Sequence, residues 1–96
     1  MNRRPRVVVY TRQGCGLCVQ AEQLVAREAR RATVEHVDVD TDDRLVERFG
    51  LRVPVVTVDD VEVAELQLAP GTVRRAVRAA RSRERTGPFR SRRRAT

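Results

Sequence analysis

Runs of apolar residues divide the chain into segments with two different periods. Three valines in a row, Val7-Val8-Val9, precede Tyr10 and predict a strand over residues 6–10 that is buried on both faces. From Gly16 onward, apolar residues recur at spacings of three and four, which predicts a helix with one apolar face. The members of that face are Leu17, Ala21, Leu24, Val25 and Ala32.

The middle of the chain predicts a second strand and a short second helix. Alternating valines indicate the strand over residues 33–40. The helix follows, because the polar run 41–43 can cap and charge its N-terminus and Gly50 can end it. This helix is expected to be only about two turns long.

The apolar runs 53–58 and 61–66 flank Asp59-Asp60 and predict an antiparallel hairpin. Asp-Asp is a weaker turn pair than Asp-Gly, although aspartate tolerates a left-handed backbone. A last helix is predicted over residues 70–81, since Val73, Ala76, Val77 and Ala80 share one helical face.

The predicted order of elements is therefore β-α-β-α-β-β-α. Its first three elements form a βαβ unit, which implies a parallel strand pair with a right-handed crossover. Combined with the hairpin, this order predicts an α/β domain with a four-stranded mixed sheet and three helices.

The charge of the chain is unevenly distributed. All 20 basic residues are arginine, and the first 80 residues carry thirteen of them against twelve acids. Residues 81–96 carry seven arginines and one glutamate, so the high net charge belongs to the C-terminus. This end shows no apolar period and contains Gly87-Pro88, so we predict a domain over residues 1–81 and a disordered Arg-rich tail over residues 82–96.

Composition also limits the cellular location and the binding partners that we expect. No apolar run is long enough for a transmembrane helix, and the run after the basic N-terminus is too short for a signal peptide. We expect a cytoplasmic monomer without membrane contact. We do not expect the tail to bind nucleic acid, because it offers Phe89 as its single aromatic and belongs to no recognisable binding fold.

The only two cysteines, Cys15 and Cys18, stand two residues apart where the first strand gives way to the first helix. This arrangement favours dithiol/disulfide chemistry, because a helix N-terminus stabilises a thiolate. A structural zinc site usually takes four ligands, and the only histidine, His36, would bring the total to three. Two alternatives stay open: a metal or iron–sulfur cluster shared between two chains, and a binding module that uses the basic tail.

Arg12 lies three residues before Cys15, and the sequence leaves two roles open for it. It can stabilise the Cys15 thiolate, or it can be a solvated loop residue. His36 lies on the second predicted strand between Glu35 and Val37, and we assign it no role.

The chain resembles the thioredoxin fold and, more narrowly, small bacterial glutaredoxin-like proteins. The resemblance rests on Cys15-Gly16-Leu17-Cys18 after the first strand, on Val53-Pro54 at the start of the third strand, and on the order of the elements. It covers roughly residues 5–80. The chain lacks the Gly-Gly pair of glutathione-binding members, and we predict no glutathione-binding residue.

The resemblance implies an activity and a role for four residues. Cys15 corresponds to the nucleophile and Cys18 to the resolving cysteine of a thiol–disulfide oxidoreductase. Pro54 corresponds to the cis-proline of the family, and the backbone of Val53 to the segment that pairs with an extended substrate. The implied partners are a disulfide-containing protein or small thiol, and an external thiol or reductase as electron donor; no cofactor or metal is expected.

Overall fold

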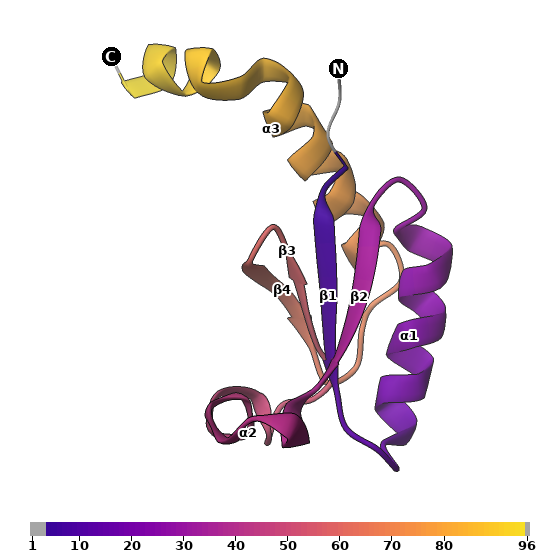
Figure 1. Ribbon diagram of the computed structural model, residues 1–96. Coiled ribbons are helices and arrows are strands. Elements are labelled where there is room, and N and C mark those ends of the chain that lie inside the picture. Colours follow the sequence, from indigo (N-terminus) through magenta and orange to yellow (C-terminus); the bar gives the residue numbers. More distant parts are fainter. Residues whose placement is uncertain (1–3, 96) are drawn as a thin grey trace.

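The computed structural model describes the backbone of residues 4–95 and the side chains of residues 4–83. Its strands are β1 (Arg6–Thr11), β2 (Thr33–Asp38), β3 (Val55–Val58) and β4 (Val61–Glu65). Its helices are α1 (Gly16–Glu28), α2 (Asp43–Phe49) and α3 (Thr72–Ala95), with a single 3₁₀ turn, η1 (Val39–Thr41), between β2 and α2. The predicted order of elements is confirmed (Figure 1).

The four strands form one mixed sheet in the order β2-β1-β3-β4. β1 runs parallel to β2 and antiparallel to β3, and β4 pairs antiparallel with β3. β1 is therefore an interior strand, which explains why Val7, Val8 and Val9 are all at most 1% exposed. This is the thioredoxin-like α/β fold that the sequence predicts.

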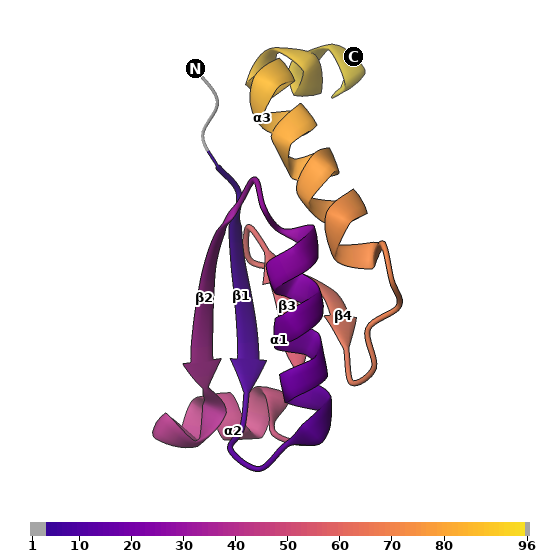
Figure 2. The ribbon, with the colours of Figure 1, turned by 90° about the vertical axis from the view of Figure 1, so that its right-hand side faces the viewer.

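The main core lies between the sheet and the pair of helices α1 and α3. Side chains alternate across a strand, so Val7 and Val9 of β1 point to the same face. There they pack with Val25 of α1 and with Val73 and Val77 of α3. Figure 2 shows α1 in front of the sheet, running along the strands, with α3 starting beside its C-terminal part and extending past it. Because the chain has few aromatic residues, valine and alanine supply most of this core.

A second, smaller core closes the end of the sheet where β1 leads toward the cysteines. α2 lies across this end in Figure 1 and buries Phe49 against Val39 and Val55. The Phe49 ring stacks on Tyr10 with the ring centroids 4.4 Å apart. The short second helix thus covers the end of β1.

β2 ends at Asp38, two residues earlier than the sequence predicts. The Asp38 carboxylate accepts a hydrogen bond from the Asp40 N–H at 2.9 Å, and Thr41 Oγ1 donates to the Asp38 carbonyl at 2.7 Å. These local bonds compete with strand pairing and turn the chain into η1. Val39, predicted as a strand residue, is instead completely buried under α2.

The hairpin turn is formed by Asp59 and Asp60, as predicted. Both have left-handed backbones, with φ of 48° and 70°. The turn is tied to the start of β1, since the Arg6 N–H donates to the Asp59 carboxylate at 2.9 Å and the Arg6 guanidinium pairs with Asp60 at 3.1 Å. Contacts with β1 therefore stabilise this turn, although Asp-Asp is a weak turn-forming pair.

α3 continues to Ala95, beyond the end predicted near Arg81. Arginine is a good helix former, so the absence of an apolar period does not by itself end a helix. In Figure 1 the ribbon of α3 changes direction toward its yellow end. The helix thus continues over residues 82–95, whereas the division of the chain into a domain and a tail at residue 81 stays a prediction. No helix in the described part of the chain is both long and apolar enough to cross a membrane.

Candidate functional site

Cys15 and Cys18 form a disulfide at the beginning of α1. Cys15 is the N-cap residue of this helix and has an extended backbone, while Cys18 lies in its first turn. Their Cα atoms are 5.2 Å apart. The strand-to-helix turn predicted from the sequence therefore brings the two thiols into bonding contact.

The two sulfur atoms have different surroundings. Cys18 is 1% exposed, whereas Cys15 is only half-buried. The Cys18 N–H donates a hydrogen bond to Cys15 Sγ at 3.1 Å, so an unpaired amide of the helix N-terminus faces the more accessible sulfur. This arrangement provides one sulfur for an incoming partner and keeps the other inside.

A surface depression of about 460 Å³ adjoins the disulfide. Besides both cysteines, Thr11, Glu22 and Asp38 contribute to its lining. Glu22 lies one helical turn after Cys18 on α1, and Asp38 pairs in register with Thr11 at the end of β2. Sequence reasoning missed these two carboxylates, although the four-residue spacing from Cys18 to Glu22 was a usable signal.

Arg12 is held by its own partners at the edge of this depression. Its Nε and Nη2 donate to the two carboxylate oxygens of Asp40, each at 3.0 Å, and its Nη1 donates to the Gly50 carbonyl at 3.1 Å. The hydrogen bond from Arg12 holds the pKa of Asp40 below its ordinary value. Arg12 is therefore not a solvated loop residue, and its role toward the thiolate stays a prediction.

Gly50 makes this arrangement possible. A Cβ atom at this position would lie 2.5 Å from the Val46 carbonyl oxygen and 3.3 Å from Nη2 of Arg12. The absence of a side chain thus lets the guanidinium approach the end of α2. Through Arg12, the segment before the cysteines is fastened both to η1 and to α2.

The Val53-Pro54 peptide bond is cis, as the family resemblance implies. Pro54 is buried, and its carbonyl accepts a hydrogen bond from the Leu66 N–H at 2.8 Å. The same N–H also approaches the Arg52 carbonyl at 3.3 Å. Within the described residues, neither the N–H nor the C=O of Val53 makes a hydrogen bond.

His36 is exposed on β2 and does not line the depression that contains the cysteines. Over residues 4–83, no three side chains of the metal-binding types gather in one place. A metal centre at the cysteine pair would therefore need ligands from a second molecule.

The chain matches a known protein family over most of its length. The model of the glutaredoxin-like domain (DUF836) matches residues 6–82. The chain belongs to this family. The match includes the disulfide, the cis-proline and all four strands of the glutaredoxin-like domain.

Solved structures share the fold of this chain. Protein XcR50 from X. campestris, a structural genomics target, is 30% identical over 76% of this chain and 96% of its own, with a TM-score of 0.65. A mutant thioredoxin from Halobacterium salinarum shares the fold at 23% identity, with a TM-score of 0.60 over 82% of this chain and 76% of its own. SA0789 of Staphylococcus aureus, a protein of unknown function, shares it at 19% identity, with a TM-score of 0.55 over 80% and 91% of the two chains. No curated protein sequence matches the chain.

Proposed function

We propose that this glutaredoxin-like domain is a thiol–disulfide oxidoreductase that reduces disulfides through Cys15 and Cys18. The observation that carries the proposal is the unequal burial of the two sulfur atoms at a helix N-terminus. Exchange requires an accessible nucleophile and a second thiol within bonding distance, and the disulfide provides both.

In the first step of the proposed reaction, the Cys15 thiolate attacks one sulfur of the substrate disulfide. The substrate S–S bond breaks, one substrate thiolate leaves, and a mixed disulfide joins Cys15 to the other half. The Cys18 thiolate then attacks Cys15 Sγ, which releases the second substrate thiol and forms the Cys15–Cys18 disulfide. Two electrons have passed to the substrate, and an external thiol or reductase returns two electrons and two protons.

The hydrogen bond from the Cys18 N–H supports the choice of Cys15 as nucleophile. In the reduced protein the same amide would face the Cys15 thiolate, and a donated hydrogen bond stabilises the charged form. The start of α1 adds a favourable helix dipole. We therefore expect the Cys15 thiol to ionise below the free-thiol pKa of about 8.5.

The unpaired backbone of Val53 supports a docking site for an extended substrate segment. An unpaired N–H and C=O can extend a strand-like ladder to an incoming peptide. The identity of the substrate, the electron donor, the monomeric state and the cytoplasmic location stay predictions.

Alkylation of the reduced protein over a pH series, read at each cysteine by mass spectrometry, tests this function. We expect Cys15 to react with an apparent pKa below about 8.5 and Cys18 to stay protected. Cys18→Ser is expected to accumulate the mixed disulfide with a model disulfide substrate, and Cys15→Ser to lose turnover. Equal reactivity of the two thiols, or turnover by Cys15→Ser, would refute the proposal.

A further inference from the structure

Five arginines on β1, on α2 and in the loops that follow these two elements are paired with carboxylates. Each of these five arginines has at least one acidic partner within 3.7 Å. They are Arg6, Arg12, Arg44, Arg48 and Arg52. Ten of the twelve acids of residues 4–83 lie between Glu35 and Glu65, in the same part of the sequence as most of these ion pairs.

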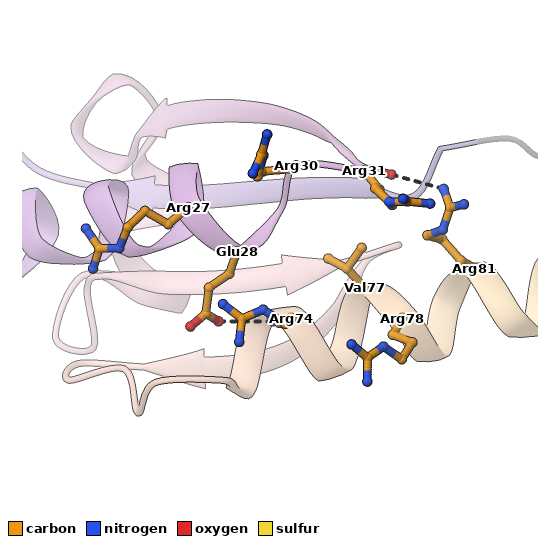
Figure 3. Close-up of a pocket in the computed structure, with 8 residues that line it drawn as sticks. All are labelled: Arg27, Glu28, Arg30, Arg31, Arg74, Val77, Arg78 and Arg81. Carbon is orange, nitrogen blue, oxygen red and sulfur yellow. Dashed lines mark hydrogen bonds between the residues drawn. The ribbon is translucent and has the colours of Figure 1, made fainter.

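A second group of six arginines lines a groove of about 510 Å³ where α3 passes the C-terminal end of α1. Figure 3 shows them on the two sides of this groove, one set from α1 and the turn after it, the other from α3. They are Arg27, Arg30, Arg31, Arg74, Arg78 and Arg81. None of these six guanidinium groups forms an ion pair with a carboxylate of residues 4–83.

Glu28, the one acid that lines the groove among residues 4–83, already accepts hydrogen bonds from the backbone of α3. Its Oε2 accepts a hydrogen bond from the Gly71 N–H at 2.7 Å, and its Oε1 accepts one from the Arg74 N–H at 3.0 Å. Burial alone would raise the pKa of Glu28, but these hydrogen bonds outweigh it and lower the pKa below its ordinary value. Among the described side chains, one negative charge therefore opposes six positive charges in the groove.

The arginines of α3 form a row along the helix. Arg74, Arg78 and Arg81 are separated by four and three residues, so they lie on one side of α3. Their rise along the axis is about 6 Å and then about 4.5 Å. The row leads from the groove toward the arginine-rich end of the sequence. An extended anion with regularly spaced charges fits this row better than a single compact anion.

We propose that this groove binds the sugar–phosphate backbone of nucleic acid without sequence preference. Guanidinium groups match phosphate oxygens in charge and geometry. Among the side chains of residues 4–83, no aromatic ring lines the groove, so the proposed recognition does not include stacking on bases. The tail over residues 82–96 did not justify this function, and the groove does not depend on it. The fold brings three arginines of α1 and the following turn beside three arginines of α3, more than 40 residues away in sequence.

This site is separate from the redox site. Arg27 lies nine residues beyond Cys18 on α1, which is about 13 Å along the helix axis. No residue of the groove lines the depression beside the disulfide. Binding is therefore expected to be the same for the oxidised protein and for a Cys15→Ser variant, and it can succeed or fail independently of the proposed reductase activity.

The test is fluorescence anisotropy of a labelled DNA duplex of about 20 base pairs with the full chain over a series of salt concentrations. The groove variant carries Arg31→Gln and Arg78→Gln, one change on each side. The control carries Arg44→Gln on α2 and Arg75→Gln on α3, which remove the same charge outside the groove. We expect the groove variant to bind about tenfold more weakly at low salt, with the slope of log K against log salt reduced by about two.

The control variant is expected to keep its affinity within about twofold and its slope unchanged, and Arg31→Lys with Arg78→Lys is expected to restore most of the binding. Duplexes of unrelated sequence are expected to bind equally. Equal losses in groove and control variants would overturn the proposal, because net charge alone would then explain binding. Polyglutamate that binds as tightly as DNA, or no binding to DNA at low salt, would also overturn it.

Discussion

Glu28 on α1 caps the first turn of α3 through a hydrogen bond of 2.7 Å from the Gly71 N–H to its Oε2. A second bond reaches the Arg74 N–H at 3.0 Å, so one carboxylate satisfies two backbone donors that a helix leaves unpaired at its N-terminus. Glu28 is nearly buried, and the first turn of α3 contains no acidic residue of its own. The contact therefore joins the two helices that cover the main core.

Replacing this carboxylate is expected to destabilise the fold. Glu28→Ala leaves two partly buried N–H groups without this acceptor, and we expect a loss of about 0.5–2 kcal/mol in the free energy of unfolding, as for the loss of a helix N-cap. Gln23→Ala, an exposed position on the same helix, is the matched control and is expected to change stability by less than about 0.5 kcal/mol. Urea unfolding of the oxidised proteins measures both, and equal stability of Glu28→Ala and wild type would show that the cap contributes nothing.

The ion pair between Arg12 and Asp40 predicts a pH dependence. The pKa of Asp40 is lowered in the folded protein, so its ionised form favours folding. This contribution is present in full above the unfolded-state pKa of about 3.9 and is lost as the pH falls through the lower folded-state value. Asp40→Asn is therefore expected to be less stable than wild type near neutral pH, and the difference is expected to vanish in strong acid.

Urea midpoints measured over a pH series test this dependence. Glu47→Gln provides the control, since this exposed side chain on α2 pairs with no described residue. Its difference from wild type is expected to stay small throughout. A difference for Asp40→Asn that does not change with pH would mean that the ionised carboxylate is not what Arg12 recognises.

Two glycines near the site are expected to respond oppositely to alanine. At Gly50 an added Cβ would meet the Val46 carbonyl oxygen at 2.5 Å, so α2 or Arg12 must shift, and we expect a loss of about 1–3 kcal/mol. At Gly16 nothing lies within 4 Å and φ is not positive, so Gly16→Ala is expected to leave stability unchanged or to raise it by up to about 1 kcal/mol.

Gly14 extends this comparison. The space around it is open, but its φ is +74°, a conformation that costs other residues roughly 1–2 kcal/mol. Gly14→Ala is therefore expected to fall between the other two variants in thermal unfolding. A ranking in which Gly16→Ala is the least stable of the three would contradict the geometry described for this turn.

The order of the elements and the position of the cysteine pair follow from local features of the sequence. These features have local causes: side-chain period separates strands from helices, and a turn needs residues that accept its backbone. Asp59-Asp60 was found in this way, and so was the strand-to-helix turn before Cys15. The local signals failed at Val39, where a hydrogen bond from Asp40 ends the strand, and after Arg81, where the helix continues without an apolar face.

The pairing of charged side chains depends on the tertiary structure. Arg12 pairs with Asp40, which is 28 residues away in sequence. Glu28 accepts hydrogen bonds from the start of α3, at sequence separations of 43 and 46 residues. An arginine on a helix surface looks the same in sequence whether its partner is a carboxylate, a carbonyl or solvent, because pairing depends on the distance set by packing and leaves no periodic pattern. Folding gathers six of these arginines into one groove and leaves the two cysteines unequally buried, and neither arrangement can be read from the spacing of residues along the chain.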